Sequence, residues 1–250
     1  MKDRNRKGAI KVHHPKMILF DYGQTLIDEE HFNGVRGTRA VLQHAAENRY
    51  GRTAEQVQAE ADRMISELSA CRDTFPFPEI PQYPFQNYLY RSQGIRLSIT
   101  PHETETIFWD AAAPGRPAPG IIELLSELKS RHIRTGVISN LSFSGQALTE
   151  RINRLIPSHS FEFILASSEV MFRKPSRRIF ELALEMAGLS AGEVWFCGDN
   201  PECDVLGAQE TGMTAVWYTG CLQGQPEPPI GEFISISAWP QLIELLNRLA

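Results

Sequence analysis

Three features are missing from the sequence, and each absence excludes a class of protein. No apolar run approaches the ~20 residues that a membrane-spanning helix needs. The amino-terminal MKDRNRKGAIKVHHPK lacks the apolar stretch of ~7–15 residues found in a secretory signal. The chain has 4 cysteines among its 250 residues, and they form no CxxC pair and no Cys/His cluster at zinc spacing. We therefore expect no membrane partner and a location in the reducing cytoplasm.

Positive charge is also in short supply. The 25 Lys and Arg residues are outnumbered by 30 Asp and Glu, which gives a formal net charge of −5. Proteins that bind nucleic acid electrostatically are usually basic, so a nucleic-acid partner is not expected. With 42% hydrophobic residues and ordinary glycine and proline content, the chain can bury a core. Its length suits one α/β core that carries an inserted lid.

Short apolar runs alternate with amphipathic segments, a pattern typical of βα units in a doubly wound, mainly parallel sheet. The expected strands are 17–20, 135–139, 161–165, 194–197, 214–218 and 233–236, and the expected helices between and after them are 120–132, 175–187 and 239–249. Nearly a hundred residues separate the first two strands, so something is inserted there. Within this insert we expect helices at 34–50, 53–70 and 101–112, a Pro- and aromatic-rich stretch at 75–90, and a return hinge at 113–119.

Polar residues follow several of these strands, at the edge where open α/β sheets bind ligands. Asp21 follows the first strand, in Phe-Asp-Tyr-Gly-Gln-Thr. Alone, it is better explained as a turn cap. Ser139 and Asn140 end the second strand and offer a hydroxyl and backbone amides to an anion, although Ser-Asn is also common in turns.

Two later motifs strengthen the case for a phosphate and metal site. Lys174 immediately precedes Pro175, which is expected to open a helix, and the charge and the helix N–H groups both favour phosphate. Asp199 and Asp204 place two carboxylates in the loop after the apolar strand 194–197. Hard oxygen ligands of this kind suit Mg²⁺.

Taken in order, DxGxT, hSN, KP and GDxxxxD resemble the four motifs of the haloacid dehalogenase superfamily, whose members are mostly Mg²⁺-dependent phosphatases. The resemblance covers about 17–218. It implies a Rossmann-like core of residues 1–26 and 115–250 and a helical cap of the first type at 27–114. The polar start of the chain, 1–16, is expected to be flexible. The resemblance also implies that Asp21 becomes an aspartyl-phosphate, that Ser139, Asn140 and Lys174 bind the phosphoryl group, and that Asp21, the Gly23 carbonyl, Asp199 and Asp204 hold the metal.

Gly23 departs from this pattern. Most phosphatases of the family carry a second aspartate at this position, which acts as general acid and base. Glycine cannot move a proton, so help worth ~10²–10⁴-fold is missing. Hydrolysis of the phospho-enzyme is therefore expected to be slow, and Gly23→Asp is expected to speed turnover if the side chain fits.

Three interpretations remain open at this stage. The first is a phosphatase with a replacement acid, such as Glu29, Glu30 or His31. The second is a non-hydrolytic protein that binds a phosphorylated ligand or regulates. The third is another reaction, such as dehalogenation, which ranks low because the Gly-Asp metal motif is present. The phosphonoacetaldehyde hydrolase branch needs a cap lysine, and residues 17–128 contain none.

For several other residues, packing or solvent exposure is a better explanation than a functional role. The aromatic residues of the insert are expected to be cap core rather than substrate contacts, and the arginines to lie on solvated helix faces. Four histidines receive no role. The aromatic residues are Phe75, Phe77, Tyr83, Phe85, Tyr88 and Tyr90; the arginines are Arg36, Arg39, Arg173 and Arg177; and the histidines are His44, His102, His132 and His159. The sequence indicates a small phosphorylated metabolite as substrate without identifying it, and leaves the oligomeric state open.

Overall fold

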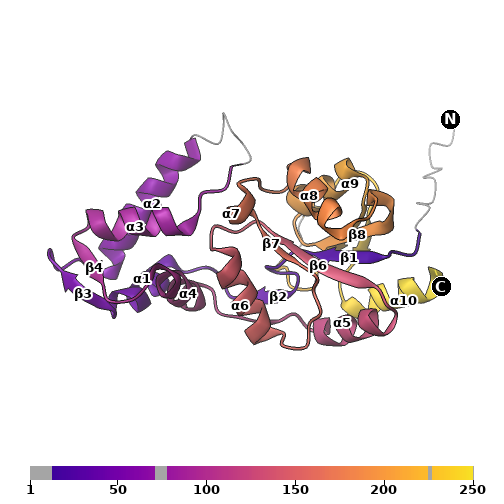
Figure 1. Ribbon diagram of the computed structural model, residues 1–250, viewed down its shortest axis with the longest axis horizontal. Coiled ribbons are helices and arrows are strands. Elements are labelled where there is room, and N and C mark those ends of the chain that lie inside the picture. The colour runs from indigo at the N-terminus through magenta and orange to yellow at the C-terminus, as the bar shows by residue number, and fades with distance from the viewer. Residues whose placement is uncertain (1–12, 71–77, 225–226, 250) are drawn as a thin grey trace.

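A six-stranded parallel sheet forms the centre of the core, in the order β10-β9-β8-β1-β6-β7 (Figure 1). The computed structural model describes residues 13–70, 78–224 and 227–249. The strands are β1 (Met17–Phe20), β6 (Arg134–Ser139), β7 (Ile164–Ala166), β8 (Val194–Gly198), β9 (Thr214–Tyr218) and β10 (Ile234–Ile236). The expected α/β fold is therefore confirmed, although β7 begins three residues later than predicted.

Helices cover both faces of this sheet, which explains why every residue of β1 is buried. One face packs against α5 (Ile121–Ser130), α6 (Gly145–Leu155) and α10 (Trp239–Leu249). The other packs against α8 (Arg177–Ala187) and α9 (Gly207–Thr211), as Figure 1 shows. Shorter turns lie between strands and helices: α7 (Ser167–Val170), η2 (Ala191–Glu193) and the π-helical η3 (Pro201–Leu206).

The insert after β1 is mainly helical. It contains α1 (Gly34–Leu42), α2 (Ala54–Ala70), α3 (Gln82–Ser92) and α4 (Pro101–Ala112), the last started by a Thr100–Glu103 capping box. The predicted helix at 34–50 is wrong beyond Leu42. Residues Ala45–Asn48 form β3, which pairs with β4 (Ile95–Leu97). The partner strand lies about fifty residues away, so local periodicity could not reveal it.

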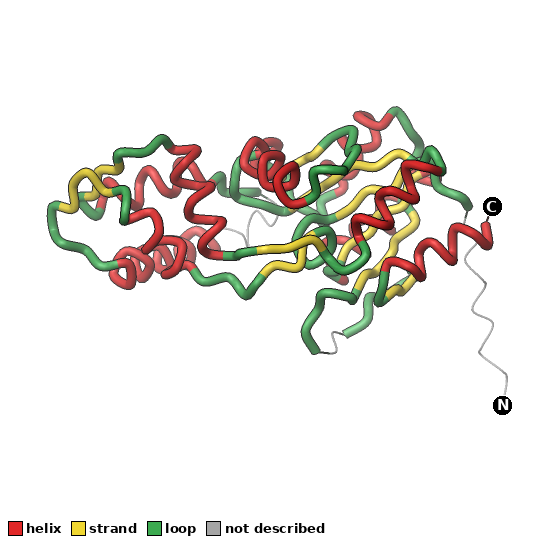
Figure 2. Tube along the Cα trace, turned by 90° about the horizontal axis from the view of Figure 1, so that it is seen from below, coloured by secondary structure: helices red, strands yellow, loops and turns green. Residues whose placement is uncertain are grey.

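Two three-residue strands connect the insert to the core. β2 (Ile27–Glu29) leaves the core and β5 (Gly115–Pro117) returns to it, and the two pair antiparallel. In Figure 2 they form a narrow two-stranded link between the helical insert and the sheet. β5 lies within the predicted return hinge.

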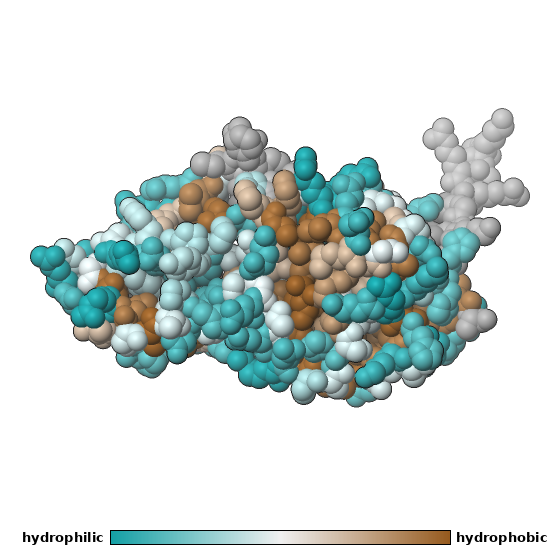
Figure 3. Space-filling model, in the orientation of Figure 1, coloured by the Kyte–Doolittle hydropathy of each residue, from teal (hydrophilic) through white to brown (hydrophobic). Residues whose placement is uncertain are grey.

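Apolar packing continues from the core into the insert. The Trp109 ring of α4 stacks on Phe143 of the core with centroids 4.5 Å apart, and Tyr22 meets Trp109 edge-on. On the face seen in Figure 3, apolar residues gather mainly over the core. Among the described residues, no helix is long and apolar enough to cross a membrane. Cys197, Cys203 and Cys221 are free thiols, whereas Cys71 lies outside the described residues.

Candidate functional site

The site lies where the strand order of the sheet reverses. The chain steps from β1 to β6 on one side, while β8 pairs on the other side of β1. Crevices at such switch points are the usual ligand sites of open α/β sheets. Asp21 follows β1 and Asp199 follows β8, and the Asp21 N–H donates to the Cys197 carbonyl at 2.8 Å. The topology thus places two carboxylates from distant parts of the sequence side by side.

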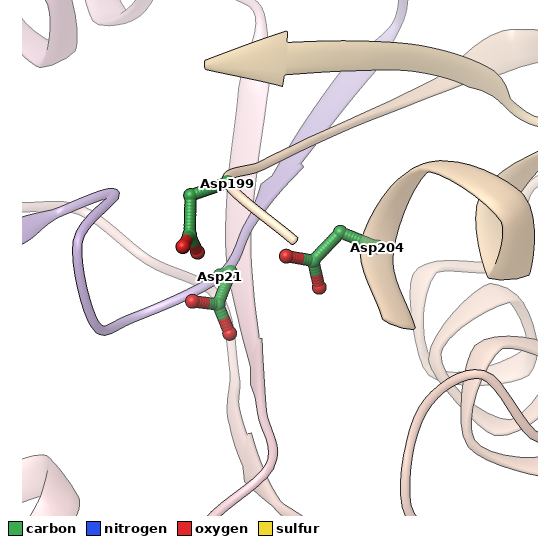
Figure 4. Close-up of side chains that lie close together, drawn as sticks. All are labelled: Asp21, Asp199 and Asp204. Atoms are coloured by element: carbon green, nitrogen blue, oxygen red, sulfur yellow. The ribbon is translucent and has the colours of Figure 1, made fainter. Parts of the chain in front are cut away.

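Asp204 joins them from the first turn after β8. One oxygen from each of Asp21, Asp199 and Asp204 lies within 4.8 Å of the other two, and Figure 4 shows the three side chains converging. Asn200 caps the η3 turn through its side chain, and its N–H donates to Asp204 Oδ2 at 2.9 Å. A Cβ on Gly198 would collide with the Asp204 carboxylate, so the glycine is needed for this approach.

Lys174 supplies the positive charge in this crevice. Its side chain is almost completely buried, and Nζ lies 2.6 Å from Asp21 Oδ1, 2.6 Å from Asp204 Oδ1 and 3.0 Å from the Ile138 carbonyl. The Asn140 amide fixes the Lys174 backbone, since Oδ1 accepts from its N–H at 2.7 Å and Nδ2 donates to its carbonyl at 2.9 Å. The Asn140 side chain is thus engaged with the protein itself.

The remaining predicted phosphate ligand, Ser139, is buried at the end of β6, beside the Ile138 carbonyl that Lys174 contacts. Pro175 does not begin the following helix, because α8 starts at Arg177 with Ser176 as its N-cap. Lys174 therefore lies three residues before the helix rather than directly before its first turn. The structure brings the predicted side chains of Asp21, Ser139, Lys174, Asp199 and Asp204 to one edge of the sheet.

Three carboxylates share the crevice with one ammonium group, and the pKa values of Asp21 and Asp199 are raised. Burial raises the pKa of Asp199 to about 8, and repulsion from Asp21 and Asp204 adds to the rise. Burial likewise raises the pKa of Asp21 to about 6, against the lowering effect of Lys174. For Lys174 burial lowers the pKa, but the charges of Asp204 and Asp21 outweigh it and the net shift is upward. The crevice therefore favours a second cation.

The donor set fits Mg²⁺. Three carboxylates present oxygen atoms at close range, while a single lysine neutralises only part of their charge. The Asp199 carboxylate has the Thr25 hydroxyl at 3.5 Å as its hydrogen-bond partner and no ion pair among the described residues. Hard oxygen ligands with an unmet demand for positive charge are what this ion prefers.

Glu29 is an acidic group that the sequence offered only as one of three alternatives. It ends β2, and a Cβ placed on Gly23 would lie 3.2 Å from its Oε2 atom. Burial raises the pKa of Glu29 to about 7; Arg151 and a hydrogen bond from Trp109 oppose the rise, and the Asp21 charge adds to it. A side-chain carboxylate therefore lies beside the position where the glycine has none.

Most of the arginines and aromatic residues that were given a structural explanation agree with it. Arg36, Arg39 and Arg177 lie on exposed helix faces and pair with Glu30, Glu55 and Glu181. The helix-face interpretation is wrong for Arg173, which precedes α8 and pairs with the buried Glu79. Tyr90 is buried and Phe85 packs against the core, but Tyr83 and Tyr88 are exposed. Phe75 and Phe77 lie outside the described residues. His102 contacts Glu105 and Glu150, a contact between α4 and α6 that spacing did not suggest.

Comparison with known proteins agrees with this geometry. Residues 101–218 match the haloacid dehalogenase-like hydrolase family. The chain is 31% identical over 172 residues to the pyrimidine 5'-nucleotidase YjjG of Escherichia coli K12, covering 68% of this chain and 74% of that protein. It is 26% identical over 245 residues to the glyceraldehyde 3-phosphate phosphatase of Pyrococcus furiosus, covering 93% of both chains.

A solved structure extends the likeness to the whole fold. The 2-haloacid dehalogenase of Pseudomonas syringae pv. Tomato DC3000 superimposes with a TM-score of 0.65 at 20% identity, covering 94% of this chain and all of that one. The fold is an α/β core with a helical insertion, and the carboxylate cluster lies at the switch point of its sheet. This chain belongs to the haloacid dehalogenase-like hydrolase family, with a cap domain and phosphatases among its relatives.

Proposed function

We propose that this chain is a Mg²⁺-dependent phosphatase that hydrolyses a small phosphorylated metabolite through an aspartyl-phosphate on Asp21. The observation that carries the proposal is the cluster of Asp21, Lys174, Asp199 and Asp204 at the switch point. The nucleotidase and the glyceraldehyde 3-phosphate phosphatase support the class of substrate, since both act on phosphate esters.

Each side chain has a role that follows from its position. Asp21 carries the nucleophilic oxygen, and Lys174 holds that carboxylate in place and attracts the anionic phosphoryl group. Ser139 and the amides around Asn140 bind the phosphoryl oxygens. The Asp21 and Asp199 carboxylates and the Gly23 carbonyl hold Mg²⁺, with Asp204 in support. When bound, the ion stabilises the charge that develops on the transferring phosphoryl group.

We further propose that residues 27–114 move as one lid about the β2–β5 link, while 1–26 and 115–250 form the core. The lid closes over the crevice and excludes water from the reacting group. The contacts between α4 and α6 support a closed arrangement in this structure.

The test is a screen of phosphorylated metabolites with Mg²⁺, including pyrimidine nucleotides and glyceraldehyde 3-phosphate, beside p-nitrophenyl phosphate. Rapid quench with radiolabelled acetyl phosphate follows the phospho-enzyme directly. We expect label on the wild type and none on Asp21→Asn. If Asp21 is never labelled and no ester is cleaved while phosphate still binds with Mg²⁺, the protein is a phospho-ligand binder instead.

A further inference from the structure

The space beside Gly23 is occupied by the Glu29 carboxylate of β2. A Cβ built on Gly23 would lie 3.2 Å from Glu29 Oε2, which is a tight contact. The space next to Gly23 is therefore filled rather than open. Gly23 is two residues after Asp21 on the same loop. Glu29 thus presents an oxygen at the place where an aspartate side chain at position 23 would begin.

The Glu29 side chain is held in this place by the link between insert and core. Its backbone pairs with Gly115 of β5, where a Cβ would lie 3.3 Å from Glu29 Cγ, so the small residue leaves room for the side chain. Arg151 of α6 lies 3.3 Å from Oε1 through Nη2. One oxygen is therefore anchored to the core, and the other faces Gly23.

The neighbouring candidates point elsewhere. Glu30 pairs with Arg36 at 3.0 Å, and 61% of its side chain is exposed. His31 is exposed. Glu30 lies just beyond the end of β2, and its side chain contacts Arg36 instead. Of the three replacement acids that the sequence allows, only Glu29 lies next to Gly23.

We infer that Glu29 is the general acid and base of the reaction, in place of the side chain missing at Gly23. The inference rests on the proposed function. In the first step an Asp21 Oδ atom attacks phosphorus, and the bond from phosphorus to the ester oxygen breaks. The ester oxygen keeps the electron pair of that bond and takes a proton from Glu29. In the second step water attacks phosphorus and gives its proton to Glu29. The bond from phosphorus to Asp21 then breaks, releasing inorganic phosphate and the free carboxylate.

This arrangement changes the expectation for Gly23→Asp. With Glu29 at 3.2 Å from the new Cβ, two carboxyl groups would share one small space. Two negative charges confined to one partly buried space repel strongly. The single variant should therefore lose activity rather than gain it, and the aspartate should help only after Glu29 is neutralised.

The experiment compares Glu29→Gln, the exchange variant G23D/E29Q, and Glu30→Gln as the matched control. The amide side chain in E29Q keeps an oxygen for Arg151, so folding should be retained, and circular dichroism checks it. We expect E29Q to slow hydrolysis of the labelled phospho-enzyme about 10²–10⁴-fold, so that the label accumulates. Phosphorylation by an alkyl phosphate should slow similarly, but phosphorylation by p-nitrophenyl phosphate less than about tenfold, because its leaving group needs little proton transfer.

The exchange variant should regain at least tenfold over E29Q, while E30Q behaves as wild type. Brisk phospho-enzyme hydrolysis by folded E29Q would overturn the inference even if Asp21 is labelled, leaving the phosphatase function intact. Equal losses in E29Q and E30Q would overturn it too, as would an identical loss for both leaving groups. A wild type that never labels Asp21 would instead remove the phosphatase function, and the role of Glu29 with it.

Discussion

Asp199 carries the least compensated charge of the crevice, and this makes the stability of the metal-free protein depend on pH. Its pKa is raised from 3.8 to about 8, so the folded protein binds a proton there that the unfolded chain has released. The stabilisation is complete below pH 3.8 and is lost as pH rises toward 8.

We therefore expect Asp199→Asn to become progressively more stable than wild type between pH 5 and 8 in EDTA, by about 1 kcal/mol, which is somewhat less than the free energy that one pKa unit represents. Urea denaturation at each pH measures this difference. In Mg²⁺ the order should reverse, because the variant should bind the ion at least tenfold more weakly, a loss of about 1.4 kcal/mol. Glu181→Gln, on the surface of α8, is the control. A difference that stays constant with pH would contradict the assignment.

At the residue scale, the sequence was informative where several motifs in order resembled those of a known family. Asp21, Lys174, Asp199 and Asp204 were predictable as a group through that resemblance, and the meeting of parallel strand ends at one edge of the sheet agrees with it. The choice among Glu29, Glu30 and His31 was not predictable. It depends on the β2–β5 register and on Arg151, which lies 122 residues along the chain from Glu29.

Among the elements, α6 is tied to both the insert and the link by one buried arginine. Arg151 donates to Asp110 of α4, to the Tyr22 hydroxyl at 2.7 Å and to the Ala113 carbonyl, besides contacting Glu29. Its guanidinium also lies 4.6 Å from the centre of the Trp109 ring. One side chain thus holds the position of α4 against α6.

Replacing this arginine should be costly, because acceptors in the interior would lose their partner. We expect Arg151→Met to lower the free energy of unfolding by about 3–5 kcal/mol. Arg154→Met is the matched control, since Arg154 contacts the same Asp110 from the surface and such pairs contribute only about 0–1 kcal/mol. Urea midpoints of the two variants provide the comparison, and similar losses in both would show that Arg151 is not the anchor.

The elements themselves were partly predictable. β1, β9, α4 and α10 have the predicted bounds: the two strands are nearly continuous apolar runs, and α4 begins after the Thr100 N-cap. α6 was not predicted, and the predicted 34–50 helix was too long. The three-residue strands β2 and β5 are too short for any period to show, and only their pairing with each other defines them.

Across the whole molecule, the insert contacts the core at a further place besides the link and the α4–α6 contacts. Glu79, at the start of the described segment before α3, is almost fully buried. It pairs with Arg173 and accepts from the Ser167 hydroxyl at 2.6 Å, and its N–H donates to the Met171 carbonyl at 2.7 Å. Arg173 is next to Lys174 in the sequence, so this contact joins the insert to the segment that carries the site's ammonium.

Glu79→Gln should open the lid without unfolding the core. The neutral side chain can still accept from Ser167, but it leaves Arg173 without its ion pair. The closed arrangement is therefore destabilised relative to the open one, in which this ion pair is not made. We expect amide exchange in 78–92 to speed up, β1 and β8 to stay protected, and kcat/KM to fall about tenfold, or about 1.4 kcal/mol. The hydrolysis rate of preformed phospho-enzyme should change much less than it does in E29Q. Glu181→Gln, which removes a surface ion pair with Arg177, is the control. Unchanged exchange in 78–92, or equal acceleration in β1, would show that Glu79 does not hold the lid.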